Sequence, residues 1–175
     1  MMIDKIIVRN AALTDIENIT VLKQQVWIAT YAVEGIRKEF ADYVLSEFTI
    51  NKIQGTLLDE NNQVLVAEID KHLIGYVEIA FHSECPVFLF KDEPEIAVLY
   101  VLERFCGMGV GKKLMDEALF RIAKMNFKAT WLTVYSKNDR ALKFYLNNQF
   151  RQVGITYFEM GTNNYENKVL RREME

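Results

Sequence analysis

Residues 104–114 are Arg-Phe-Cys-Gly-Met-Gly-Val-Gly-Lys-Lys-Leu, and they hold three of the chain's eight glycines within five positions. This segment follows Ile96–Leu102, an apolar run typical of a buried strand. It precedes residues 110–125, whose apolar side chains recur at helical spacing. A glycine-rich turn from a strand into a helix lets backbone N–H groups and the helix dipole converge on an anion. The segment therefore predicts a phosphate-binding loop.

Two common phosphate-loop patterns do not fit this segment. The dinucleotide pattern GxGxxG fails because Lys112 stands where the third glycine belongs. The Walker A pattern fails because the spacing is one residue short and Lys113 replaces the Ser or Thr that holds magnesium. A tight turn with positive φ explains one or two of the glycines but hardly three. The two lysines oppose the helix dipole, which favours a bound phosphate that neutralises them.

A second constellation begins about 30 residues downstream, after the strand-like run Thr130–Tyr135. Asn138 is a good N-cap for a following helix. The sequence there is Asn-Asp-Arg-Ala-Leu-Lys-Phe-Tyr-Leu-Asn-Asn-Gln-Phe, from Asn138 to Phe150. Together the two segments resemble the GNAT superfamily of N-acetyltransferases. Its pyrophosphate loop is Gln/Arg-x-x-Gly-x-Gly/Ala before a helix, and its later motif is Asn-x-x-Ala-x-x-Phe-Tyr-x-x-x-Gly-Phe.

The resemblance covers roughly Leu65 to Phe158. We align Gly109 and Gly111 with the two motif glycines, which puts Leu114 at the family's first core leucine and Cys106 at the Gln/Arg position. An alternative frame uses Arg104, Gly107 and Gly109. Gln149 stands where the family has glycine, and we expect Asn148 to take the left-handed helix cap instead.

The order of the patterns is mixed rather than regularly alternating, which predicts a mixed sheet. The resemblance implies an α/β (α+β) fold with a single GNAT-like domain over residues 1–175. It has a mixed, mostly antiparallel sheet of six to seven strands, splayed at the cofactor site, with helices on both faces. About residues 1–60 form substrate-side helices, about 64–158 the acetyl-CoA-binding core, and 159–175 a closing strand.

The expected strands are residues 3–9, 64–69, 73–81, 95–102, 130–135, 150–158 and 168–172, with a hairpin turn at 70–72. A first helix is expected behind a capping box at Thr14–Glu17, with helical spacing from Ile16 to Thr30. Further helices are expected at about 36–48, 50–58, 110–125 and 138–147. Residues 83–94 are expected to be irregular.

The resemblance implies acetyl-CoA as cosubstrate and no metal. Main-chain groups of the strand before the loop and the side-chain amide of Asn138 would contact the pantetheine arm, and the loop amides would bind the pyrophosphate. Tyr145 would lie beside the sulfur of the thioester. The implied cofactor-binding residues are Leu99, Tyr100, Val101, Gly107, Met108, Gly109, Val110, Gly111, Lys112, Asn138, Ala141, Phe144 and Tyr145.

The resemblance assigns Tyr145 as the general acid toward the thiolate leaving group. A phenol has a pKa of about 10 and a thiol of about 8.5, so full proton transfer is uphill by roughly 2 kcal/mol. Hydrogen bonding to the developing charge is the milder form of the same role. The acceptor amine must also lose a proton. The family's usual glutamate position holds Ala97, and Glu95 is the base we name. Glu78, His82 and a chain of water molecules are left open.

Bulk composition limits the partners. The net charge of −3 gives no field that attracts nucleic acid, and seven apolar residues in a row are too few for a membrane span. The amino terminus lacks a signal-peptide pattern, and Cys85 and Cys106 form neither a zinc nor a disulfide spacing. We expect a cytoplasmic protein, and a homodimer is left open.

The function we expect is acetyl transfer from acetyl-CoA to a primary amine of a small molecule. Tyr157–Gly161 resembles the bacterial polyamine acetyltransferase branch, which suggests a polyamine. Acetylation of a peptide or protein, and a non-catalytic acyl-CoA-binding regulatory module, are the alternatives. Specificity should come from the loop 83–94, where acidic residues attract a cation, and from aromatic residues of the first helices. These residues are Glu84, Asp92, Glu93, Trp27, Tyr31, Phe40 and Tyr43.

Overall fold

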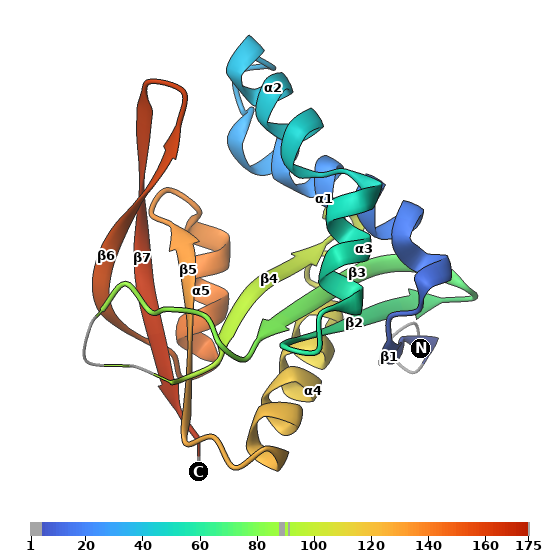
Figure 1. The fold of residues 1–175 in the computed structure, drawn as a ribbon, viewed down its shortest axis with the longest axis vertical. Coiled ribbons are helices and arrows are strands. Elements are labelled where there is room, and N and C mark those ends of the chain that lie inside the picture. The colour runs from blue at the N-terminus through green and yellow to red at the C-terminus, as the bar shows by residue number, and fades with distance from the viewer. Residues whose placement is uncertain (1–4, 88–89, 91, 175) are drawn as a thin grey trace. The chain divides into compact units, whose positions relative to one another are not determined.

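The computed structural model describes residues 5–87, 90 and 92–174. Its helices are α1 (Ile16–Tyr31), α2 (Lys38–Glu47), α3 (Ile50–Leu58), α4 (Val110–Lys124) and α5 (Asp139–Asn147). Its strands are β1 (Ile7–Asn10), β2 (Asn62–Ile69), β3 (His72–Ala80), β4 (Glu95–Val101), β5 (Ala129–Tyr135), β6 (Arg151–Met160) and β7 (Asn163–Glu173) (Figure 1).

The strands form one seven-stranded sheet in the order β1-β2-β3-β4-β5-β7-β6. The pairs β1–β2, β5–β7 and β6–β7 are antiparallel, and β4–β5 is parallel. The expected mixed, mostly antiparallel sheet is therefore confirmed. The chain divides into two compact units. The first unit comprises residues up to Ile79 together with Val98–Ala118, and the second comprises Ala80–Ala97 together with residues from Leu119 on.

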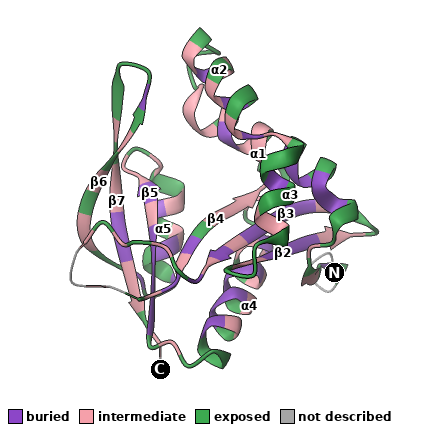
Figure 2. Ribbon diagram, in the orientation of Figure 1, coloured by how far each residue is buried: buried purple, intermediate pink, exposed green. Residues whose placement is uncertain are grey.

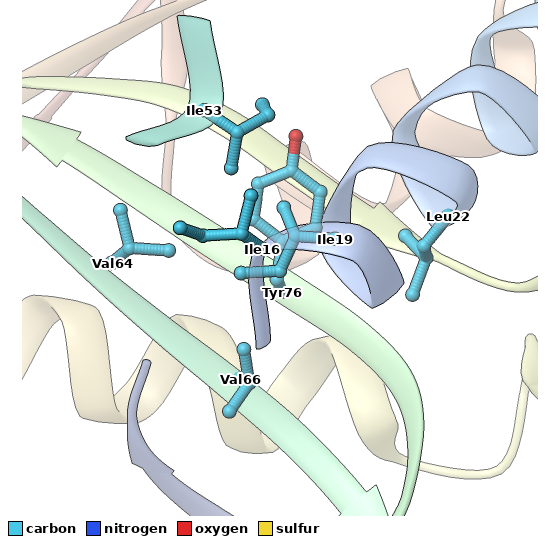
Figure 3. Packing of buried hydrophobic residues seen from close by; sticks show 7 residues of the cluster. All are labelled: Ile16, Ile19, Leu22, Ile53, Val64, Val66 and Tyr76. Carbon is cyan, nitrogen blue, oxygen red and sulfur yellow. The ribbon is translucent and has the colours of Figure 1, made fainter. Parts of the chain in front are cut away.

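In the first unit, α1 and α3 pack on one face of β2 and β3. The strand residues that face them alternate along the chain, as the period of a strand requires. The helices contribute isoleucines and a leucine at helical spacing, and Figure 2 shows the buried stretches of these elements. The cluster consists of Ile16, Ile19, Leu22, Ile53, Val64, Val66 and Tyr76 (Figure 3).

The opposite face of the same strands packs against α4. Leu114 and Met115 are fully buried. A Cβ added at Gly75 would lie 2.8 Å from the Tyr100 carbonyl oxygen and 3.2 Å from the Leu114 side chain. Only glycine therefore fits on β3 at this level. Gly75 and Tyr76 are neighbours on a strand and point to opposite faces, so the strands of this unit have helices on both faces, as expected.

A tight turn joins β2 to β3. Asp70 and Lys71 have φ values of +49° and +66°, and two consecutive left-handed residues are the geometry of a type I′ hairpin turn. This turn confirms the hairpin expected at residues 70–72.

The entry to α1 differs from the expected capping box. The helix begins at Ile16, and the Asp15 carboxylate, not Thr14, closes the preceding turn by accepting from the Ala12 N–H at 2.8 Å. Arg9 donates to the two oxygens of Asp15 at 2.7 and 2.9 Å and also to Glu68. These hydrogen bonds hold the pKa of the Asp15 carboxyl below its usual value. The Thr14–Glu17 box was wrong because an arginine from β1 fixes the carboxylate of Asp15.

In the second unit, β6 and β7 are longer than the sequence predicted. They pair from Arg151–Arg171 to Met160–Asn163 and turn at Gly161, whose φ is +59°. The polar run 163–167 belongs to the expected closing segment 159–175 but lies before the strand expected at 168–172. It pairs in a hairpin in which Asn163, Asn164 and Glu166 are exposed, so water can solvate these polar side chains. At the other end of the chain, β1 begins at Ile7, and positions 3–4 of the expected first strand lie outside the described residues.

We predict opposite effects from alanine at two glycines of the first unit. Gly75→Ala should lower the free energy of unfolding by roughly 1–3 kcal/mol, because the new methyl group overlaps a backbone oxygen. Gly55→Ala, in the middle of α3 with nothing within 4 Å, should raise it by about 0.5–1 kcal/mol. Urea denaturation of both variants measures this, and equal effects would contradict the packing of β3 against β4.

Candidate functional site

The glycine-rich segment has the backbone of a tight strand-to-helix turn. After β4, Glu103–Phe105 form a 3-10 turn, and α4 begins at Val110. Gly107 and Gly109 have φ values of +79° and +84°, which side-chain-bearing residues rarely adopt. Gly111 lies in the first turn of α4 without a positive φ. A positive φ thus explains Gly107 and Gly109, whereas the backbone conformation of Gly111 does not require glycine.

The loop presents the N-terminus of α4. The Lys113 N–H donates to the Gly109 carbonyl at 3.0 Å and so forms the first helical hydrogen bond. The N–H groups of Val110, Gly111 and Lys112 come before it and point along the helix axis, at the positive end of the helix dipole. A Cβ at Gly107 would meet nothing within 4 Å, so the loop borders open space. This arrangement can hold a phosphate.

The two lysines of the loop have partners within the protein. Lys112 forms an ion pair with Asp116, one turn along α4, and both side chains are more than half exposed. The Lys113 ammonium donates to the Ile6 carbonyl at 3.1 Å. A bound phosphate is therefore not required to explain lysines in the first turn of α4. Lys113 instead ties the helix to the segment before β1.

Cys106 occupies the position where the resemblance expects Gln or Arg. Its Sγ lies 3.7 Å from the carbonyl oxygens of Val101 and Leu102. The thiol thus supports the end of β4 as a weak donor. It supplies no charge to the loop, and the anion-binding groups are the backbone amides.

The second motif lies in the second unit, on α5. Asn138 caps the helix, because its side-chain oxygen accepts from the Ala141 N–H at 3.1 Å, as the sequence predicted. The left-handed residue at the other end is Gln149, with φ +67°, and not Asn148 as expected. The Asn148 side chain instead donates to the Phe144 carbonyl at 2.8 Å. Gln149, at the position where the family motif has glycine, therefore has the left-handed conformation at this end of the helix.

Tyr145 is buried on α5, with 8% of its surface exposed. Its ring makes edge contacts with Phe144 at 5.4 Å and Phe150 at 5.9 Å between centroids. Burial raises the pKa of the phenol well above its ordinary value. The hydroxyl therefore stays protonated at neutral pH and can donate a hydrogen bond.

The candidate bases have different surroundings. In the second unit, Glu95 begins β4 opposite Trp131, and the Ser83 hydroxyl donates to its carboxylate. His82 is exposed in the turn after β3. In the first unit, Glu78 is half-buried on β3, and burial raises the pKa of its carboxyl while Lys23 opposes the shift.

The sequence analysis missed Lys23. It lies on α1 at helical spacing from Ile19 and Trp27, which are both buried, so a charged residue on this face was the available signal. Burial lowers the pKa of its ammonium, and the carboxylates of Glu78 and Glu47 oppose that shift. The Lys23 Nζ lies 5.1 Å from the centroid of the Phe48 ring.

The aromatic residues expected to set specificity form a cluster between α1 and α2. Trp27 stacks on Tyr31 at 4.6 Å and on Tyr43 at 5.0 Å. Phe40 and Phe48 meet the same indole edge-on. Three of these side chains are buried, and the two tyrosines are half-buried. The cluster holds α1 and α2 together, and its part in specificity stays a prediction.

The described part of the loop 83–94 is irregular, as expected; Phe88, Leu89 and Lys91 lie outside the described residues. Glu93 forms a bidentate ion pair with Arg171, with an NH2–Oε1 distance of 2.8 Å. Its charge is thus already neutralised within the second unit. Glu84 is exposed and remains a candidate for attracting a cation.

The sequence was compared with protein families and with known proteins. The model of the Acetyltransferase (GNAT) family matches residues 25–150. An N-acetyltransferase of Archaeoglobus fulgidus is 35% identical over 102 residues, which cover 58% of this chain and 69% of the relative. A spermidine N(1)-acetyltransferase of Thermoplasma acidophilum is 21% identical over 148 residues, or 82% of this chain and 87% of that protein.

Among solved structures, the PaiA N-acetyltransferase of Thermoplasma acidophilum in complex with coenzyme A has the same fold. The TM-score is 0.76 at 18% identity, covering 97% of this chain and 99% of that chain. Across the described ranges of this chain, we find no helix long and apolar enough to cross a bilayer. The same ranges hold no group of three His, Cys, Asp or Glu side chains placed to bind a metal ion.

We predict that the cap of α5 contributes measurably to stability. Asn138→Ala removes the acceptor of the Ala141 N–H and should lower the free energy of unfolding by about 1 kcal/mol. Asn138→Asp keeps an acceptor at the same place and should stay close to the parent. Chemical denaturation of both variants decides this. Equal losses in both would show that the cap bond is not the source.

Proposed function

This chain belongs to the GNAT acetyltransferase family, and we propose that it moves an acetyl group from acetyl-CoA to a primary amine of a small molecule, with a polyamine as the favoured acceptor. The observation that carries this proposal is the loop between β4 and α4. Its left-handed glycines lead into the N-terminus of α4, and a Cβ added at Gly107 would meet nothing within 4 Å. That is the arrangement that the pyrophosphate of coenzyme A requires.

The residues of the first unit have a binding role in this proposal. The N–H groups from Gly109 to Lys112 receive the pyrophosphate. The polar main-chain groups of Leu99, Tyr100 and Val101, on the strand that leads into the loop, receive the pantetheine arm. Because Cys106 stands where the family motif has Gln or Arg, this binding is left to backbone amides.

The second unit supplies the donor for the leaving group. When bound, acetyl-CoA brings a thioester whose sulfur leaves as a thiolate. Tyr145 donates its O–H toward that sulfur and so lowers the energy of the developing charge. Its raised pKa makes release of the proton less favourable than for a free phenol. We therefore assign Tyr145 a hydrogen-bonding role, with the proton of the thiol supplied in the end by the reacting amine.

The spermidine acetyltransferase relative supports a polyamine as acceptor, because the similarity extends over 87% of that protein. The net charge of −3 agrees with a cationic substrate. Acetylation of a peptide or protein is the competing activity, and a non-catalytic acyl-CoA-binding module is the competing non-enzymatic function. A cytoplasmic location and a homodimer stay predictions.

An acceptor panel distinguishes these functions. The purified protein is given acetyl-CoA with spermidine, spermine, amino acids or a lysine-containing peptide, and products are identified by mass spectrometry. We expect acetylated polyamine as the main product. Acetylated peptide without acetylated polyamine would contradict the small-amine proposal. Stabilisation by acetyl-CoA in a thermal-shift assay without any product would favour the binding module.

We predict that Tyr145→Phe lowers kcat by a factor of about 100 and leaves the Kd for acetyl-CoA within about threefold, because the ring is kept and only the donor is lost. Tyr157→Phe, on the exposed face of β6, is the matched control and should behave like the parent. Steady-state kinetics and calorimetric binding measure the two quantities. An unchanged kcat in Tyr145→Phe would remove this residue from the mechanism.

A further inference from the structure

Polar groups gather on the α1 side of β3 and β4, beside the apolar cluster of the first unit. Tyr76 and Glu78 are two residues apart on β3, so their side chains share a face. Tyr76 belongs to the cluster under α1, and Val98 and Tyr100 of β4 pack against it. Lys23 reaches the same region from α1 and interacts with Glu78.

A backbone hydrogen bond and a ring contact fix how β3 lies against β4 in this unit. The Leu102 N–H donates to the Ile74 carbonyl at 2.9 Å, and the Tyr76 and Tyr100 rings meet edge-on at 5.9 Å. A step of two residues forward on β3 is thus a step of two backward on β4, so the strands are antiparallel, as the arrows in Figure 1 show. One more such step brings Glu78 level with Val98.

This level matters for the reaction. Val98 lies directly after Ala97, the position at which the family usually has its glutamate, and directly before Leu99–Val101, to which we assign the pantetheine arm. Glu78 therefore lies on the α1 face of the sheet, one residue along β4 from the level of Ala97, whose own side chain points to the opposite face.

The Glu78 carboxylate is available for a ligand. Within residues 5–87, 90 and 92–174, it forms no hydrogen bond and no ion pair within 4.0 Å. It is half-buried, so solvent still reaches it. The Tyr76 hydroxyl, on the same face, is fully buried and has no hydrogen-bond partner in those ranges. A partly desolvated carboxylate and an unsatisfied buried hydroxyl on the same face cost folding free energy, which favours a role in binding or catalysis.

We propose that Glu78 binds the ammonium group of the acceptor and removes its proton, a role that rests on the proposed acetyl transfer. The carboxylate takes one proton from R–NH3+ and becomes a neutral acid. The freed lone pair of R–NH2 forms the N–C bond to the acyl carbon as the C–S bond breaks. The departing sulfur takes the second nitrogen proton, giving a thiol and a neutral amide. Glu78 then releases its proton to water.

Lys23 is a positioning residue in this proposal. Its positive charge favours the ionised form of Glu78, against the burial that raises the pKa of that carboxyl. Tyr76 on β3 and Tyr100 on β4 are the other titratable groups on this face, and Glu47 of α2 acts on Lys23. Lys23 lies near Glu78 but forms no direct bond to its carboxylate, so the ammonium group of the acceptor can still bind the carboxylate.

The pH dependence of acetyl transfer to spermidine tests the proposal. In the parent protein, kcat/KM should rise as Glu78 loses its proton and then stay level up to the pKa of the amine, about 10. In Glu78→Gln, kcat/KM at pH 7.5 should fall by a factor of about 100. It should then climb about tenfold per pH unit, because only the amine already neutral in solution reacts.

Two further variants frame this test. Glu60→Gln, exposed after α3, is the matched control and should keep the parent's profile. Lys23→Gln should move the rising limb of the profile to higher pH, because the charge that favours the carboxylate is lost. A profile in Lys23→Gln identical to the parent's would contradict the assigned role of Lys23.

Binding without acetyl-CoA gives a second readout. Calorimetric titration with spermidine alone should show a Kd about tenfold weaker in Glu78→Gln than in the parent, while the two proteins unfold at similar urea concentrations. Parent-like kcat/KM and Kd in Glu78→Gln would overturn the proposal. The proposal would also be overturned if only Glu95→Gln lost the range in which kcat/KM stays level with pH, because Glu95 would then be the base. Absence of any acetylated amine from the parent would instead contradict the proposed function.

Discussion

The turn from β4 into α4 is the constraint on which the rest of the candidate site depends. Gly107 and Gly109 adopt left-handed backbone, which brings the N-terminus of α4 close behind the end of β4. Leu114 then packs over Gly75, at a point of β3 where no side chain fits. The same placement of α4 thus packs the helix on β3 and presents its N-terminal amides. The anion site follows from this placement.

In the first unit, a buried apolar cluster lies next to a pair of charged residues. The cluster around Ile19 and Tyr76 supplies burial on the α1 side of the strands. Beside it, Lys23 and Glu78 are kept partly desolvated without a direct bond between them. A fold selected for stability alone gains little from such a pair. A carboxylate that must meet an ammonium ion gains from it, because the attraction is stronger where water is scarce.

Local signals made much of the site predictable. The glycine spacing, the Asn138 cap and the hairpin at Asp70–Lys71 depend on a few neighbouring residues, and the structure has all three. Several predictions failed where a distant partner decides the outcome, although the left-handed residue after α5, Gln149 instead of Asn148, is a local exception. Arg9 fixes the carboxylate of Asp15 at the start of α1, and the Ile6 carbonyl accepts a hydrogen bond from the Lys113 ammonium. Lys23 was missed for the same reason, since its surroundings come from other elements. The family resemblance supplied the role of Tyr145, which no local pattern carries.

A backbone amide titration tests the central claim, that the loop before α4 holds the pyrophosphate of coenzyme A. Coenzyme A is added to isotopically labelled protein, and the N–H resonances are followed by NMR, with inorganic pyrophosphate as a second ligand. We expect the resonances of Gly109, Val110, Gly111 and Lys112 to shift with both ligands, and that of exposed Gly55 on α3 to stay unchanged. Saturable binding of coenzyme A that leaves those four amides unmoved would contradict the account.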